Sequence, residues 1–153
     1  MAFEYIIIGY VYVIATRLKV FNRRFLRQFD EVHQEAFGKD KKTPQWGYPD
    51  TGNGWFAQKL PYKDWYEFNC AQRVHLNFLE SFAFVALVSL VAGIVYPDEA
   101  FLFQMIYILG RFIFTYAYWN MGPIYRIPGV ILLWIGQIAN LYYAIKTCLA
   151  LVE

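Results

Sequence analysis

The chain carries little charge for its length. Charged side chains make up 17% of its 153 residues, whereas soluble domains carry roughly 25%. Apolar residues account for 58% and aromatic residues for 21%, and the mean hydropathy is positive. This composition argues against an ordinary soluble domain. It predicts an all-α membrane protein, with a single membrane domain over residues 1–153.

Cysteine is also scarce, and the net charge is small. Cys70 and Cys148 lie far apart in apolar stretches, which argues against a disulfide framework or a metal site. We expect both to be small buried residues. A net charge of +2 gives no indication of nucleic-acid binding. The N-terminus has no basic segment and no small-residue cleavage site after its first apolar run, so we expect the first helix to be retained as an anchor.

Long apolar runs predict a bundle of four transmembrane helices, about residues 3–20, 64–96, 98–120 and 129–151. Ten of the fourteen Lys and Arg residues lie between Arg17 and Lys63, and the loop at residues 97–99 has none. Basic loops face the cytoplasm or matrix. The first and third loops should therefore face that side, and both termini the other.

The first loop, residues 21–63, is unusually long. Apolar positions in residues 21–37 follow a helical period among charged residues, which predicts an amphipathic extension of the first helix at the membrane surface or against a partner. Residues 38–63 are rich in proline and glycine and should be irregular. Tryptophan and tyrosine alternate there with lysine. This pattern fits an interfacial aromatic belt or a docking surface for another protein.

Polar residues form a stripe on the second predicted helix. Arg73, Asn77 and Glu80 are spaced by four and three residues and so share one helical face. Ionisable groups inside a membrane cost at least about 2.5 kcal/mol each, so they indicate a functional site.

The third helix adds Arg111 and, seven residues later, Tyr118. A matching ligand would be zwitterionic, with carboxylates for the arginines and an amine for Glu80, as in glutathione. The alternative is that these charges only neutralise one another inside the bundle.

Other polar residues in the helices favour structural roles. His75 points away from the stripe and is expected to pack or to lie at the interface. Gln104, Gln137 and Asn140 should form hydrogen bonds between helices.

Residues 68–80, FNCAQRVHLNFLE, together with Gly110, Arg111 and Tyr118, resemble the MAPEG family. This family contains the microsomal glutathione S-transferases and leukotriene C4 synthase, and the motif is most similar to that of the type 3 microsomal glutathione transferases. The resemblance implies a homotrimer of four-helix bundles in the endoplasmic reticulum or another endomembrane, with a mitochondrial membrane as the alternative.

The resemblance also implies glutathione as co-substrate, bound between subunits. The residues implied to bind it are Arg73, Asn77, Glu80, Arg111, Tyr118 and Arg126, and Arg17 matches a further glutathione-contacting arginine. The reaction implied is attack of the glutathione thiolate on a hydrophobic, lipid-like electrophile, or reduction of a lipid hydroperoxide. No metal is implied.

The chain departs from the family pattern at several positions. The thiolate-stabilising arginine expected after Arg17 is Leu18, which leaves Arg17 or Lys19 as candidate catalytic cations. Ser81 and Phe114 stand where the family commonly has tyrosines. The first loop is longer than the family's by roughly thirty residues.

Three hypotheses follow for the function. The first is a glutathione-dependent transferase or peroxidase of the membrane. The second is a catalytically degenerate subunit of a larger membrane complex, docking through residues 21–63. The third, a receptor, channel or transporter, lacks support because the chain shows no repeat of interrupted helices and no polar pore stripe on several spans.

Overall fold

The computed structural model describes residues 2–152, with side chains from residue 4, and these residues are predominantly helical with no strand among them. Contacts divide the chain into two compact units: an N-terminal unit of residues 2–75 and a C-terminal unit that begins at Leu76. The long helix α5 (Tyr62–Val95) contributes to both. The single membrane domain expected over residues 1–153 stays a prediction.

Three helical segments of the described chain are long and apolar enough to cross a membrane. They are α5, α6 (Pro97–Asn120) and the segment Pro123–Ala150, which contains α7 (Ile127–Ala150). Each of the last two has a proline in its first turn, where the missing N–H needs no partner inside the helix. These segments agree with the predicted second, third and fourth helices to within a few residues, and an all-α membrane protein is confirmed.

The predicted first span, residues 3–20, is not among these three segments. The chain there is helical through α1 (Ala2–Ile6), a π-helical stretch (Ile7–Val13) and α2 (Ile14–Val20). Its uninterrupted apolar core is shorter than the ~20 residues that a span normally needs. The predicted count of four spanning helices is therefore not confirmed, and neither is the trimer.

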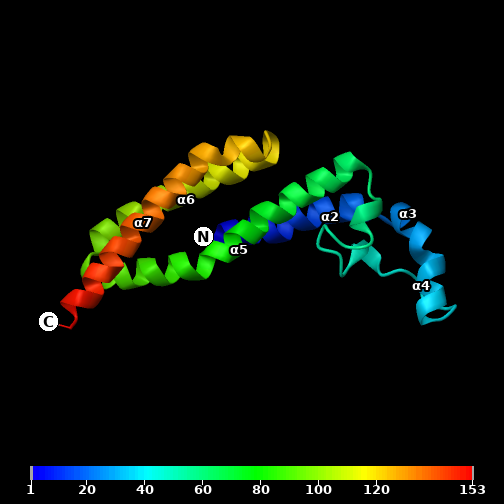
Figure 1. The fold of residues 1–153 in the computed structure, drawn as a ribbon, viewed down its shortest axis with the longest axis horizontal. Helices are drawn as coiled ribbons and strands as arrows, with labels where there is room; N and C mark the ends of the chain where they lie inside the picture. Colours follow the sequence, from blue (N-terminus) through cyan, green and yellow to red (C-terminus); the bar gives the residue numbers. More distant parts are fainter. Residues whose placement is uncertain (1, 153) are drawn as a thin grey trace. The chain divides into compact units, whose positions relative to one another are not determined.

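In the C-terminal unit, α6 and α7 lie side by side (Figure 1). Glycines permit the close approach. A Cβ on Gly129 would lie 2.5 Å from the backbone nitrogen of Phe114, and one on Gly136 would lie 2.6 Å from the carbonyl oxygen of Phe103. Small residues at a helix interface increase the van der Waals contact that holds membrane helices together.

In the N-terminal unit, the predicted extension of the first helix is wrong in one respect. Helix α2 ends at Val20, and Asn22 is extended, with φ −69° and ψ 162°. The Asn22 side chain accepts a hydrogen bond of 3.0 Å from the backbone N–H of Phe25 and so starts a new helix, α3 (Arg23–Leu26). A single 3₁₀ turn then leads into α4 (Asp30–Phe37) (Figure 1).

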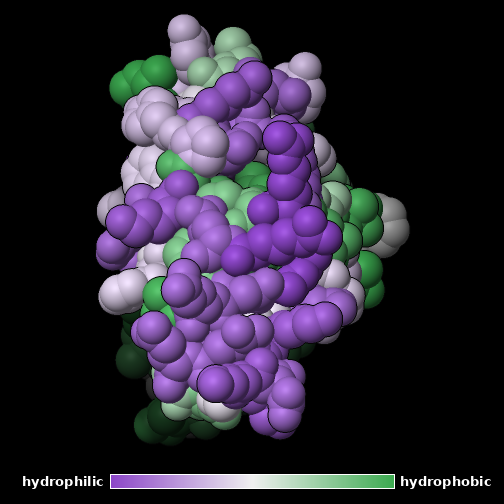
Figure 2. All heavy atoms as spheres, turned by 90° about the vertical axis from the view of Figure 1, so that its right-hand side faces the viewer, coloured by the Kyte–Doolittle hydropathy of each residue, from purple (hydrophilic) through white to green (hydrophobic). Residues whose placement is uncertain are grey.

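After α4 the chain is irregular apart from two 3₁₀ turns, Gln45–Gly47 and Ala57–Lys59, as expected from its prolines and glycines. The loop is nevertheless packed. A buried cluster lies beneath it, formed by Val20, Phe21, Leu26, Phe29, Ala57, Leu60 and Phe68. Hydrophilic side chains predominate on the outer face seen in Figure 2. The loop is thus an ordered part of the N-terminal unit.

Candidate functional site

The C-terminal unit brings together two of the predicted binding residues. Arg111 of α6 is fully buried, and one of its terminal nitrogens donates a 2.8 Å hydrogen bond to the side-chain oxygen of Asn77 on α5. Its guanidinium carbon lies 5.1 Å from the ring centres of both Phe78 and Phe114. An amide and two ring faces therefore surround this buried cation.

A second guanidinium approaches the same place. Arg126, in the turn before α7, lies 5.3 Å from the ring centre of Tyr118 and 5.7 Å from that of Phe114. The Phe114 ring therefore contacts both Arg111 and Arg126. Two cations flanking one ring beside a buried phenol form a group that suits a carboxylate ligand.

Glu80 and Arg73 are both exposed on α5. Glu80 follows Asn77 by three residues in the same unit, as the predicted stripe requires, whereas Arg73 belongs to the N-terminal unit. Both side chains have interactions of their own. Two of the predicted ligand-binding groups thus lie at the surface of a single chain.

Tyr107 makes a polar contact that was not predicted from the sequence. Its hydroxyl lies 3.1 Å from the hydroxyl of Ser81, which also bonds to the backbone carbonyl of Asn77 at 3.0 Å. Tyr107 is 1% exposed and precedes Arg111 by one helical turn. That spacing of four residues could have identified it.

The hydrogen bonds between helices predicted for Gln104 and Asn140 occur further along the unit. Ser89 of α5 donates to the side-chain oxygen of Gln104 on α6 at 2.5 Å, and Asn140 of α7 donates to Ser89 at 3.4 Å. Asn140 is 2% exposed. These polar groups connect three helices.

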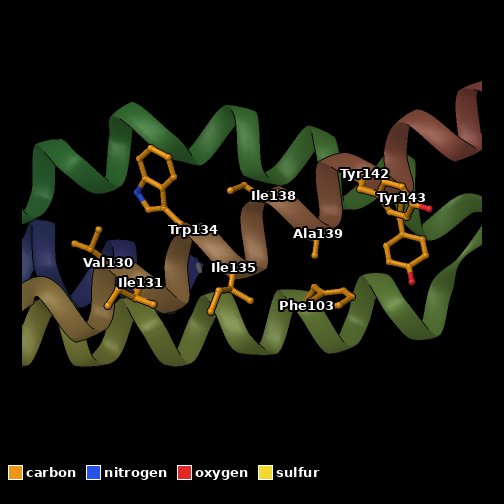
Figure 3. A pocket seen from close by; sticks show the side chains of 9 residues that line it. All are labelled: Phe103, Val130, Ile131, Trp134, Ile135, Ile138, Ala139, Tyr142 and Tyr143. Atoms are coloured by element: carbon orange, nitrogen blue, oxygen red, sulfur yellow. The ribbon is translucent and has the colours of Figure 1, made fainter.

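An apolar groove runs along α6 and α7 in the same unit (Figure 3). Its volume is about 840 Å³, and Phe103, Trp134 and Tyr143 are among its lining residues. Nearly all of the lining is apolar side chain. The groove suits a hydrophobic molecule or a lipid chain.

In the N-terminal unit, Arg17 is held by the long loop. The side chain is 4% exposed and donates to the backbone carbonyls of Asp50 at 2.6 Å and Trp46 at 3.3 Å. Its guanidinium carbon lies 4.2 Å from the ring centre of Tyr48 and 5.0 Å from that of Phe68. Both carbonyls come from a segment that the sequence indicated only as irregular.

Asp50 organises the same loop. Its carboxylate accepts hydrogen bonds from the backbone N–H groups of Gly52 at 2.7 Å, Gly54 at 3.0 Å and Ala57 at 2.7 Å. Sequence reasoning missed this residue. The signal was the run Asp-Thr-Gly-Asn-Gly, because an aspartate two residues before a glycine is typical of a side-chain-capped turn.

Arg17 and Lys19, the two candidate catalytic cations on either side of Leu18, both interact with neighbouring groups. Arg17 is buried under the loop, and Lys19 forms an ion pair with Glu67 in which the charged atoms lie 2.5 Å apart. Leu18 itself is 43% exposed. The end of the first helix therefore presents a leucine where the family resemblance implies a thiolate-stabilising cation.

His75 packs against the first helix, as its position off the stripe suggested. Its ring lies 5.5 Å from that of Tyr5, and a Cβ on Gly9 would lie 2.8 Å from its Cε1 atom. No group of three or more His, Cys, Asp or Glu side chains within residues 2–152 is placed to hold a metal ion.

Comparison with known proteins gives one match. A family model described as the MAPEG family matches residues 32–146, which is well over half of the chain. No curated protein and no solved structure matches it. The family match includes Asn77, Arg111, Tyr118 and Arg126, and also most of the long loop.

Proposed function

Because the chain belongs to the MAPEG family, which includes glutathione-dependent transferases and peroxidases, we propose that it binds glutathione and transfers it to hydrophobic electrophiles or uses it to reduce lipid hydroperoxides. The observation that carries the proposal is the pairing of buried Arg111 with Asn77, next to Tyr118 and Arg126. These groups match the carboxylates and amides of glutathione.

In the transferase reaction, the glutathione thiolate attacks an electrophilic carbon, and the leaving group departs with its electron pair. In the peroxidase reaction, two glutathione thiols are oxidised to the disulfide while the hydroperoxide is reduced to an alcohol and water. Both need the thiolate, whose formation a nearby cation favours. Because Arg17 donates to two loop carbonyls, we assign this role to Arg111 or Arg126.

The exposure of Arg73 and Glu80 supports contact with a neighbouring subunit, which we propose to be another copy of the chain in a homotrimer. Exposed charged groups on a membrane helix are costly unless a neighbour covers them. A second copy that covers this side of α5 would enclose a glutathione molecule between subunits. The apolar groove of Figure 3 offers a route for the hydrophobic substrate from the membrane lipids. We also propose that the protein is similar to the type 3 microsomal glutathione transferases and lies in the endoplasmic reticulum or another endomembrane.

Calorimetric titration with glutathione and turnover of chlorodinitrobenzene and a lipid hydroperoxide test this function. Arg126→Gln should weaken binding about tenfold, the order of effect expected for one charge-assisted hydrogen bond. Lys146→Gln is the matched control, because Lys146 also lies over aromatic rings, 4.9 Å from the ring centre of Tyr96, but away from the site. Absence of both binding and turnover in the unmodified protein would refute the proposal.

One observation favours a second function, a catalytically degenerate subunit of a larger membrane complex. The first helix offers no accessible guanidinium, since Arg17 is buried under the loop and Leu18 follows it. Native gels in mild detergent separate the two functions. A particle of roughly three times 18.1 kDa favours the enzyme, and migration only with a much larger complex favours the subunit.

A further inference from the structure

A second pocket lies in the N-terminal unit, beside the junction of α2 and α3. Its volume is about 310 Å³, at the lower end of the range of small-ligand sites. It is lined by apolar side chains, Leu18, Phe21, Leu26 and Trp46, and by polar ones, Asn22, Arg23 and Gln45. None of these residues belongs to the proposed glutathione site.

The backbone around this pocket is fixed by contacts described above. Arg17 binds the carbonyl of Trp46, whose φ of 64° is unusual for a residue with a side chain. The next residue, Gly47, lies so close that a Cβ there would be 2.4 Å from the Phe21 ring. The pocket is therefore formed before any ligand arrives, with Arg17 as the residue that positions its Trp46 wall.

The lining combines apolar side chains with a cation, as a binding site for an amphiphile requires. Phe21 and Leu26 are each 1% exposed and form an apolar floor, and Leu18 is 43% exposed. Arg23 donates to Asp30 through one nitrogen at 2.6 Å, and its side chain is 38% exposed. A guanidinium has five N–H donors, so Arg23 retains the capacity to bind an anionic head group.

Charge in this part of the chain favours an anion. Residues 17–63 contain ten Lys and Arg residues and five Asp and Glu residues, a difference of five positive charges. The segment joins the first helix to the membrane span α5, which places it near lipid head groups. A chain of about ten carbons matches the pocket volume.

From these observations we propose that the pocket beside Leu18 binds a single-chain anionic amphiphile, with its alkyl chain against Leu18 and Trp46 and its head group at Arg23. The site is distinct from the proposed glutathione site, because none of the residues that line it is among the glutathione-binding residues.

Fluorescence quenching in phosphatidylcholine nanodiscs tests the proposal. The full-length protein keeps Trp46 as its single tryptophan, with the other four replaced by Phe, and is titrated with bromododecanoate and with its methyl ester. We expect saturable quenching of Trp46 by the carboxylate and weaker quenching by the ester. A second protein that keeps only Trp55, an exposed loop residue that does not line the pocket, should show a linear response.

Three variants test which side chain contacts the head group of the amphiphile. Arg23→Gln should weaken bromododecanoate binding about tenfold and leave the ester unchanged. Arg24→Gln, at an exposed neighbour that does not line the pocket, is the control. Arg23→Lys, which keeps a cation at the same position, should retain binding. Linear quenching of Trp46, or equal losses in Arg23→Gln and Arg24→Gln, would overturn the proposal.

Discussion

Arg111 is a cation buried inside a membrane helix bundle, and its surroundings explain how the fold tolerates it. The Asn77 amide accepts one of its hydrogen bonds, and two aromatic rings cover the guanidinium. A buried charge is costly to leave without such contacts. The pair thus stabilises the bundle and holds α5 against α6 at the proposed ligand site.

Replacing Asn77 by Leu should therefore affect stability as well as binding. Loss of an acceptor from a buried charged group costs about 1–3 kcal/mol, so thermal unfolding in detergent should occur at lower temperature and glutathione affinity should fall. Asn120→Leu is the control, because Asn120 is exposed and its side chain donates to the carbonyl of Tyr116 in the same helix. An unchanged melting temperature for Asn77→Leu would contradict a structural role for the pair.

The ionisation of Asp30 should make the stability of the loop depend on pH. Hydrogen bonding to Thr43 and the ion pair with Arg23 lower the pKa of this carboxyl below its ordinary value. The carboxylate therefore stabilises the fold above the unfolded-state pKa of about 4, and this stabilisation is lost as the pH falls below it. Limited proteolysis of residues 38–63 should accelerate below about pH 4.

Asp30→Asn should make this proteolysis fast at every pH and remove its dependence on acid. Asp40→Asn is the matched control, since Asp40 lies in the same loop and is exposed. If Asp40→Asn abolishes the acid response and Asp30→Asn does not, the assignment to Asp30 is wrong.

The sequence predicted some of these residue contacts and not others. Asn77 and Arg111 stand out because polar residues are rare in apolar helices. The contacts of Arg17 could not be predicted, because its acceptors are backbone carbonyls 29 and 33 residues away. Every residue has a carbonyl group, so the sequence gives no sign of which one will accept.

At the scale of elements, the pairing of α6 with α7 depends on glycine. Gly129→Ala should destabilise the pair by about 1–3 kcal/mol, because the added Cβ meets the backbone of Phe114 and cannot be accommodated by a side-chain rotation. Thermal unfolding followed by circular dichroism measures the effect.

Gly93→Ala provides the comparison within the same unit. A Cβ there would lie 3.9 Å from that of Ala100, an ordinary contact. Alanine is also the better helix former by about 1 kcal/mol. This variant should be as stable as the unmodified protein or more stable, and similar losses at both glycines would argue against close packing as the cause.

Element boundaries were predictable where composition changes sharply. The prolines and long apolar runs located α5, α6 and α7. The break at Asn22 was missed because the hydrophobic period continues through it, while a local side-chain cap ends one helix and starts the next. Capping acts on single residues, and periodicity averages over many.

For the whole molecule, the number of membrane crossings determines where the termini lie. Basic residues should hold the long loop on the cytoplasmic or matrix side. If residues 3–20 also cross the membrane, both termini lie on the other side. If only α5, α6 and α7 cross, the N-terminus stays on the side of the loop.

Maleimide labelling in sealed vesicles measures this. With Cys70 and Cys148 replaced by Ala, and in sealed vesicles that keep their cytoplasmic face outward, a cysteine at Lys41 should react and one at Asp98 should be protected. We expect cysteines added at the two termini to behave like the one at Asp98. Reaction of the N-terminal cysteine, with the C-terminal one still protected, would show that the first helix does not cross.

The loop that covers Arg17 has one further consequence, for protein engineering. Asp50 holds the loop from within, but two further supports lie outside it: the guanidinium belongs to α2, and Asn69 of α5 donates to the carbonyl of Gly52 at 3.0 Å. Residues 38–63 transplanted alone into another helical protein would lack both. A host could accept the loop as an ordered insert only if it offers an arginine and an asparagine at the same two places.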